Sequence, residues 1–315
     1  MNGVVVKSTG SWYLVRTDKG GTHKCRIRGK FRMNGIKSTN PVSVGDRVEF
    51  DLEPQKETGV IVRIFERSNY IVRKSVNLSK RTHIIASNID RAFLVITIDN
   101  PPTTTSFIDR FLVSAEAYHI PVTLLFNKID TYSEEANDLK EELVSIYTGI
   151  GYQCLEISAK NGVNVESVKT LMRDNITLFS GHSGVGKSTL VNTIEPSLNL
   201  KTIEISEQHK QGQHTTTFAE MHPLSFGGYI IDTPGIKGFG MVDFEEEKIS
   251  GYFPEFFEMQ QDCKFHNCKH LDEPKCAIKK GIEEDIIAPS RYFSYVQIMR
   301  GEEEHFRQDI YSQKK

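Results

Sequence analysis

A glycine-rich segment lies in the middle of the chain: Gly181-His182-Ser183-Gly184-Val185-Gly186-Lys187-Ser188. It follows the apolar run Ile176 to Phe179 and precedes a helix-like stretch, Thr189 to Ile194. Such glycines let backbone N–H groups turn onto a phosphate, while the lysine reaches the β- and γ-phosphates and the serine ligates Mg²⁺. The segment therefore predicts a nucleotide-binding α/β domain. Lys187 and Ser188 are its expected catalytic residues, and Thr189 is included in the site.

Two further motifs lie earlier in the chain, each directly after an apolar run typical of a buried strand. They are Asn127-Lys128-Ile129-Asp130 and Ser158-Ala159-Lys160. Asp130 can accept hydrogen bonds from the N1–H and 2-amino groups of guanine, which adenine lacks, and an unpaired acid facing adenine would be unfavourable. Lys128 is expected to pack over the base. At the ends of neighbouring strands, the two motifs predict the base-reading side of a guanine-nucleotide site.

The magnesium side of the site is predicted from residues after the glycine-rich loop. Asp232-Thr233-Pro234-Gly235 follows an apolar run; Asp232 is expected to hold Mg²⁺ through water, and the Gly235 N–H to sense the γ-phosphate. A simple turn after a strand is the alternative interpretation. Residues 212–217 match a switch segment, in which one threonine should reach Mg²⁺; the sequence leaves open which one.

The residue after this motif bears on catalysis. Ile236 stands where Ras-like GTPases carry a water-orienting glutamine, and isoleucine cannot orient water. Slow intrinsic turnover is therefore expected, with His214 or a group from a partner positioning the water. A surface-loop histidine is the alternative for His214.

The order of these motifs indicates how the domain is built. Small GTPases begin with the glycine-rich loop, whereas here the base-reading motifs precede it. Residues 69–242 are therefore expected to form a circularly permuted GTPase domain with a doubly wound sheet. Its apolar strands are predicted at 92–98, 122–126, 154–157 and 176–179, and its helices at 107–119, 133–147 and 165–173.

Residues 1–68 predict a small barrel of the OB type that binds RNA. Short strand-like runs at 4–6, 12–15, 23–28, 46–52 and 59–64 are separated by turn residues. Residues 1–50 carry ten Lys or Arg against three acids in a chain of net charge −2, which favours a polyanionic partner. Alternation in residues 24–28 places Lys24, Arg26 and Arg28 on one strand face. A merely solvated basic surface is the alternative, as is a core position for Trp12 or Phe31.

Residues 243–315 predict a zinc-binding domain that ends in a helix at 291–300. Cys263, Cys268, His270 and Cys276 have the spacing C-x4-C-x-H-x5-C, which matches a closed tetrahedral structural Zn²⁺ site. His266 competes with His270 for the fourth position, and reduced, unliganded cysteines are the alternative. The overall prediction is a multidomain α/β protein.

Composition agrees with a cytoplasmic protein. The 315 residues are 38% hydrophobic and 25% charged, as expected of a globular chain. No signal peptide is visible at Met1 to Gly10, and the strongest apolar run, Phe93 to Ile98, is far too short to cross a bilayer. No membrane partner is expected.

Over essentially its whole length the chain resembles the bacterial small-subunit-dependent GTPases of the RsgA/YjeQ family. The basic barrel, the permuted motifs, residues 212–217, Phe253-Pro254-Glu255-Phe256 and the Cys-Cys-His-Cys cluster carry the resemblance. It implies a monomer that binds the 30S subunit and 16S rRNA, hydrolyses GTP to GDP with Mg²⁺ under stimulation by that subunit, and acts in late subunit maturation. A slow-turnover, nucleotide-gated RNA- or ribosome-binding module is the alternative, because Ile236 replaces the glutamine.

Overall fold

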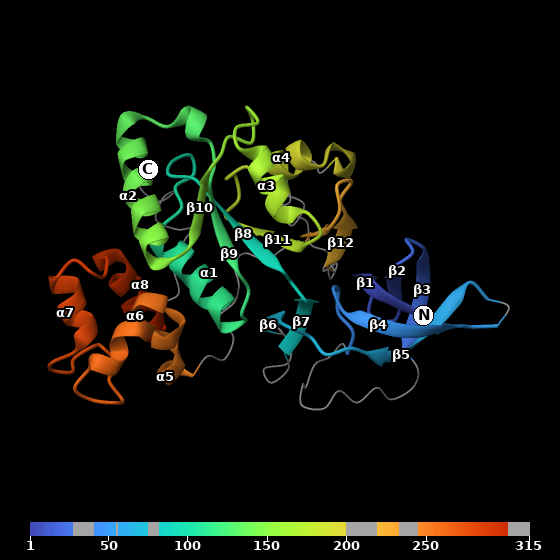
Figure 1. Ribbon diagram of the computed structural model, residues 1–315, viewed down its shortest axis with the longest axis horizontal. Coiled ribbons are helices and arrows are strands. Elements are labelled where there is room, and N and C mark those ends of the chain that lie inside the picture. Colours follow the sequence, from blue (N-terminus) through green and yellow to red (C-terminus); the bar gives the residue numbers. More distant parts are fainter. Residues whose placement is uncertain (28–40, 55, 75–81, 200–218, 233–244, 302–315) are drawn as a thin grey trace, which may run out of the picture. The chain divides into compact units, whose positions relative to one another are not determined.

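The computed structural model describes residues 1–27, 41–54, 56–74, 82–199, 219–232 and 245–301 (Figure 1). The chain divides into two compact units. The first comprises Met1–Thr103 and Ser114–Val242, and the second comprises Thr104–Val113 and Asp243–Lys315. The division runs through helix α1 (Thr105–Ala117), so one helix supplies residues to both units.

The first unit begins with a closed five-stranded barrel. Its strands are β1 (Asn2–Ser8), β2 (Tyr13–Thr17), β3 (Thr22–Ile27), β4 (Arg47–Leu52) and β5 (Thr58–Ile64). They pair in the order β1-β2-β3-β5-β4, and β4 returns to β1 to close the barrel. The interior is filled by apolar residues such as Val15, Cys25 and Phe50. Gly59 is required there, because a Cβ at this position would lie 2.8 Å from the Phe50 ring and 2.9 Å from Cys25 Sγ.

A two-stranded sheet, β6 (Tyr70–Lys74) with β7 (Thr82–Ser87), follows the barrel. It is tied to the barrel by Asp46, which is fully buried. The Asp46 carboxylate accepts hydrogen bonds from the Arg67 guanidinium at 2.6 Å and from Ser87 Oγ at 2.6 Å. Gly45 allows the close approach, since a Cβ there would lie 2.0 Å from the Ser87 carbonyl oxygen.

The sheet of the nucleotide-type domain has the order β10-β9-β8-β11-β13-β12. Its strands are β8 (Arg91–Ile96), β9 (Val122–Phe126), β10 (Gln153–Glu156), β11 (Ile176–Ser180), β12 (Glu220–Pro223) and β13 (Tyr229–Asp232). Neighbouring strands are parallel except β12, which pairs antiparallel with β13. At its far edge β12 also meets the barrel strand β1, through one residue pair, Lys7 opposite Glu220, whose side chains form an ion pair at 2.7 Å.

Helices cover both faces of this sheet, as the burial of nearly every residue of β8 and β9 requires (Figure 1). α3 (Val165–Met172) and α4 (Lys187–Ile194) pack on one face, where alternate β8 residues Phe93 and Val95 join their core. α2 (Glu134–Ile150) lies across the sheet from them. Short 3-10 helices occupy Ile129–Thr131 and Pro196–Leu198.

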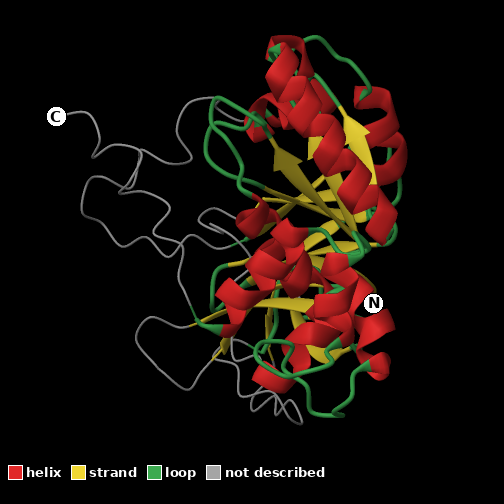
Figure 2. Ribbon diagram, turned by 90° about the vertical axis from the view of Figure 1, so that its left-hand side faces the viewer, coloured by secondary structure: helices red, strands yellow, loops and turns green. Residues whose placement is uncertain are grey.

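In its described residues the C-terminal part of the second unit contains helices and loops (Figure 2). The helices are α5 (Glu246–Ile249), α6 (Pro254–Met259), α7 (Ala277–Glu283) and α8 (Pro289–Met299), with 3-10 turns at Ser250–Tyr252 and Gln260–Asp262. Phe253, Phe256 and Tyr295 form its aromatic core. The fully buried Arg291 joins α8 to α1 and α6 through ion pairs to Asp109 at 2.6 Å and Glu255 at 2.7 Å.

The predicted fold class is confirmed in all three parts, with element ends that differ by a few residues. On β3 the expected alternation holds for the described residues: Lys24 and Arg26 are exposed, and Cys25 is buried. Trp12 is half-buried at the surface, whereas its neighbour Tyr13 is in the core. Arg28 and Phe31 lie outside the described residues. Over the part of the chain that the structure describes, no helix is long and apolar enough to span a membrane.

Candidate nucleotide and metal sites

Asn127 connects three of the sequence motifs. It follows β9, is 1% exposed, and has all its polar groups bonded. Its N–H donates to the Ile96 carbonyl at 2.8 Å, and its own carbonyl accepts from the Tyr132 hydroxyl. Its side-chain Nδ2 donates to the Val185 carbonyl at 2.8 Å, while Oδ1 accepts from the Ala159 N–H at 3.0 Å. The buried Asn127 therefore holds three segments together: its side-chain amide bonds the glycine-rich loop and the Ser-Ala-Lys loop, and its backbone N–H bonds the end of β8.

Asp130 is held by a hydrogen bond to one carboxylate oxygen and is otherwise exposed to solvent. Its Oδ1 accepts a hydrogen bond at 2.6 Å from the buried Ser158 hydroxyl, which in turn accepts from the Asn161 N–H at 3.1 Å. The Asp130 residue itself is exposed, as are Lys160 and its surroundings on the loop. Lys128 has a left-handed backbone, with φ 67°, and its Nζ donates to the Asn100 carbonyl at 2.6 Å. A fixed, solvent-facing carboxylate is what recognition of a planar base edge requires.

The glycine-rich loop passes between β11 and α4 over Asn127. Gly181, Gly184 and Gly186 all have φ between 87° and 141°. At Gly186 a Cβ would lie 2.4 Å from Asn127 Nδ2, so glycine is needed for this contact. Lys187 Nζ donates to the carbonyl oxygens of Gly181 at 2.6 Å and His182 at 2.5 Å. Burial lowers the pKa of Lys187 to about 8, and a phosphate at this position would supply the missing counter-charge.

The structure places only part of the predicted magnesium side. Ser188 and Thr189 lie half-buried in the first turn of α4. Asp232 ends β13, which runs parallel to β11 in register Leu178 opposite Ile231, so its backbone reaches the same edge of the sheet as the glycine-rich loop. Residues 212–217 with His214, and Gly235 with Ile236, lie outside the described residues, and their roles stay predictions.

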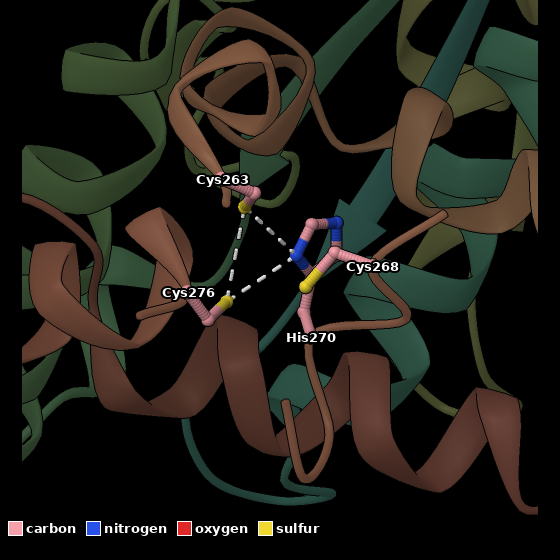
Figure 3. A group of neighbouring side chains, drawn as sticks. All are labelled: Cys263, Cys268, His270 and Cys276. Carbon is pink, nitrogen blue, oxygen red and sulfur yellow. Dashed lines mark hydrogen bonds between the residues drawn. The ribbon is translucent and has the colours of Figure 1, made fainter. Parts of the chain in front are cut away.

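The four predicted zinc ligands converge in the second unit (Figure 3). One ligand atom from each of Cys263, Cys268, His270 and Cys276 lies within 4.8 Å of every other. His270 Nδ1 lies 3.6 Å from Cys263 Sγ and 3.4 Å from Cys276 Sγ, and the two sulfurs are 4.0 Å apart. Tetrahedral Zn²⁺ with bonds of ~2.3 Å needs ligand separations of about 3.8 Å. The cluster therefore fits a structural zinc site, whereas His266 is exposed and outside it.

Burial favours the uncharged thiols and imidazole of this cluster, so thiolates at this position need a bound cation. Burial raises the pKa of Cys268 to about 12, raises that of Cys276 and lowers that of His270. His270 Nε2 is buried and lacks a hydrogen-bond partner among the described residues. The surrounding backbone is fixed from α8: Tyr292 donates to the His270 carbonyl at 2.8 Å and Tyr295 to the Lys269 carbonyl at 2.7 Å.

Sequence reasoning missed three polar residues beside these sites. Tyr132 bonds to Asn127, Asp46 ties the barrel to β7, and Arg291 joins the helices of the second unit. None belongs to a recognisable motif, and each finds its partners only in the folded chain. For Tyr132 the sequence offered one indication of a role at the site: it lies two residues after Asp130.

Comparison with known proteins agrees with this arrangement. A family model described as the RsgA GTPase matches residues 64–242, and one described as the RsgA N-terminal domain matches residues 2–61. Two relatives are named small ribosomal subunit biogenesis GTPase RsgA. The protein from Christiangramia forsetii is 65% identical over 99% of both chains. That from Flavobacterium psychrophilum is 62% identical over 99% of this chain and 96% of its own.

Two solved structures have the same fold. YjeQ from Thermotoga maritima is 35% identical with a TM-score of 0.78, covering 95% of this chain and 97% of its own. YloQ, described as a circularly permuted GTPase, is 31% identical with a TM-score of 0.74, covering 95% and 94%. The fold and the order of the motifs define a circularly permuted GTPase with an N-terminal barrel. Within that class, the chain belongs to the RsgA GTPase family.

Proposed function

We propose that this chain binds GTP with Mg²⁺ and hydrolyses it under stimulation by the small ribosomal subunit, in the biogenesis of that subunit. The observation that carries the proposal is the convergence of Asn127, the Asp130–Ser158 pair and the glycine-rich loop at one edge of the sheet. The partner is inferred from relatives that are 65% and 62% identical and are named for small-subunit biogenesis.

The base-reading roles follow from the hydrogen bonds. Asp130, held by Ser158, accepts from the two guanine donors that adenine lacks, and this gives a preference for GTP and GDP over adenine nucleotides. Lys128 is anchored at Asn100 and lies along the base. Asn127 and Ala159 hold the two loops in place. Ile129 and Lys160, which belong to the same two motifs, keep their predicted places beside the base.

The phosphate roles belong to the glycine-rich loop. Lys187 exchanges the carbonyls of Gly181 and His182 for phosphate oxygens when the nucleotide binds. Ser188, in the first turn of α4, and Asp232, at the end of β13, offer the oxygen donors that Mg²⁺ prefers and would hold the ion. The ion neutralises charge on the transferred phosphate. His214 and Gly235 keep their predicted roles in positioning water and sensing the γ-phosphate.

The barrel supplies the contact with the RNA of the subunit. Lys24 Nζ lies 4.6 Å from the centroid of the half-buried Trp12 ring, and RNA-binding barrels combine cations and aromatic rings in this way, here for 16S rRNA. Arg26 contributes less free charge, because it pairs with Glu53 at 2.5 Å. One Zn²⁺ on Cys263, Cys268, His270 and Cys276 stabilises the C-terminal domain. A monomer working in the cytoplasm, where ribosomes are assembled, completes the proposal.

The decisive experiment measures GTP hydrolysis by the full chain with and without purified small subunits, in wild type and in Ser188→Ala. Wild type should be slow alone and strongly stimulated by subunits. Ser188→Ala should lose most hydrolysis in both conditions, because it removes a Mg²⁺ donor. His214→Ala should bind GTP normally and lose only the stimulated rate. Stimulation of His214→Ala equal to wild type would assign the water to another residue or to the ribosome.

The same measurement separates the alternative function. A nucleotide-gated binding module would bind the subunit in the GTP state and release it in the GDP state, yet show no stimulated turnover. Ile236, in the position of the usual glutamine, is the observation that favours this second candidate.

A further inference from the structure

Tyr132 links the ends of two strands beside the candidate base pocket. It follows the 3-10 turn Ile129–Thr131, directly after the Asn127–Asp130 motif. Its hydroxyl accepts a hydrogen bond from the Ile98 N–H at 3.1 Å and donates one to the Asn127 carbonyl. A tyrosine hydroxyl is protonated at neutral pH and remains a donor, and burial raises the pKa of Tyr132 further, to about 12. The phenol therefore links the segments that follow β8 and β9 through one accepted and one donated hydrogen bond.

The segment on the β8 side, residues 98–102, forms a closed loop against the nucleotide motifs. Thr97 and Thr103 fasten its base, with the Thr103 N–H donating to the Thr97 carbonyl at 2.9 Å and the Thr97 N–H to Thr103 Oγ1 at 3.2 Å. From this loop, Asn100 accepts the Lys128 ammonium at 2.6 Å. Pro101 Cδ lies 3.3 Å from the position that a Cβ on Gly184 would take. The 98–102 loop thus contacts both the base-reading motif and the glycine-rich loop.

We propose that Tyr132 is a positioning residue for guanine selectivity: its hydroxyl fixes the Asn127–Asp130 segment relative to the 98–102 loop. This rests on the proposed function, since it concerns how the same pocket distinguishes bases. Asp130 is held on one side by Ser158, and Lys128 is held at its tip by Asn100. Tyr132 adds a third contact, a hydrogen bond from its hydroxyl to the backbone carbonyl of Asn127.

The substitution Tyr132→Phe removes only the hydroxyl. The ring and its packing stay, while the Ile98 N–H and the Asn127 carbonyl each lose a partner. Partly buried groups left in this way recover their hydrogen bonds through water or by moving, and both responses shift the Asp130 segment. Guanine offers Asp130 two donors, N1–H and the 2-amino group, whereas hypoxanthine offers only N1–H. A displaced Asp130 therefore loses more with GDP than with IDP.

Tyr152 provides a matched control in the same unit. It is 8% exposed, and its hydroxyl donates to Glu116 at 3.0 Å. It precedes β10, at the amino end of a parallel strand, and so lies at the sheet edge opposite to the nucleotide motifs. Tyr152→Phe removes a comparable hydrogen bond without touching the base pocket.

The test measures the dissociation constants of GDP, IDP and ADP with the full-length protein, together with its thermal unfolding. We expect Tyr132→Phe to weaken GDP binding about tenfold, because the shifted Asp130 segment makes poorer hydrogen bonds to guanine. The ratio of the IDP to the GDP constant should fall severalfold, and Tyr152→Phe should leave it at the wild-type value.

An unchanged IDP-to-GDP ratio in Tyr132→Phe would overturn the proposal, as would an equal fall in both variants. Unfolding of Tyr132→Phe at the assay temperature would make the hydroxyl a stability element and also overturn it. Wild-type protein that binds ADP as tightly as GDP would instead refute the proposed function, so the two failures are distinguishable.

Discussion

The base-reading edge and the cysteine–histidine cluster differ in what bonds to their polar groups. At the base-reading edge the polypeptide supplies the hydrogen bonds: every polar group of Asn127 is bonded, and the Ser158 hydroxyl donates to Asp130. In the cluster the three thiols and the imidazole face mainly one another, and His270 Nε2 has no partner among the described residues. We therefore expect the first site to be formed without its ligand and the second to depend on a bound metal for its stability.

The largest effect should come from metal removal. Chelation, or Cys268→Ser, should unfold the region around residues 263–276, because structural zinc contributes ~10 kcal/mol or more to folding. Hydrogen exchange should then rise in these residues, while residues 122–127 and 176–180 stay protected. Elemental analysis of the purified protein should show one zinc per chain. Protein without zinc that keeps its protection at 263–276 would remove the contrast between the two sites.

Substitution of Arg291 tests whether buried ion pairs stabilise the second unit in addition to the metal. Arg291→Met leaves the carboxylates of Asp109 and Glu255 without their buried cation, and should lower the free energy of unfolding by about 3–5 kcal/mol. Lys280→Met, which breaks the exposed pair with Glu284, should cost less than about 0.5 kcal/mol. Urea unfolding of the zinc-loaded variants compares them. Equal midpoints would show that the metal alone holds this unit.

Asp130→Asn sharpens the contrast from the side of the nucleotide. It should weaken GTP and GDP binding by about 1–3 kcal/mol, since a charge-assisted pair is lost, yet barely change the melting temperature. The Ser158 hydroxyl can still donate to the amide oxygen, so the loop keeps its shape. Asp138→Asn, at an exposed position on α2, is the control and should change neither quantity. A large fall in Tm with Asp130→Asn would show that the edge is not independently formed.

The smallest effect is expected at Glu195, whose carboxylate accepts hydrogen bonds from the polypeptide itself. Hydrogen bonds from the Ser197 hydroxyl at 2.6 Å and the Ser225 N–H at 2.7 Å lower the pKa of Glu195 to about 2 from 4.5. A lowered folded-state pKa stabilises the protein above pH 4.5, and this stabilisation is lost as the pH falls toward 2. Glu195→Gln should therefore reduce stability by ~1 kcal/mol at pH 7 and progressively less below pH 4.5. A pH-independent difference would contradict the assignment.

The sequence predicted what short-range patterns encode. Apolar runs gave the strands β8 to β11, and turn residues separated the strands of the barrel. The spacing of Cys263, Cys268 and Cys276 indicated the metal cluster, and His270 was preferred over His266 from the same spacing. These features are local, because each rests on a few consecutive residues or on a periodicity of two or about 3.6.

Contacts between distant segments could not be predicted. The β6–β7 sheet and the edge strand β12 are short and lack the continuous apolar runs of buried strands. The side-chain partners of Asp46 and Arg291 are separated from them in sequence by 21 to 182 residues. Tyr132 looks like an ordinary residue at the end of a turn until β8 and β9 lie side by side. Such pairings depend on the complete fold and carry no signature in one sequence.

A titration of GDP and ADP into zinc-loaded and zinc-stripped full-length protein tests whether the base-reading site forms independently of the metal cluster. We predict that GDP binds much more tightly than ADP, and that removing zinc changes the GDP affinity by less than about threefold, within the range of weak coupling. Equal binding of ADP would contradict the assignment of Asp130. Loss of GDP binding on zinc removal would contradict a base-reading site that is formed by the polypeptide alone.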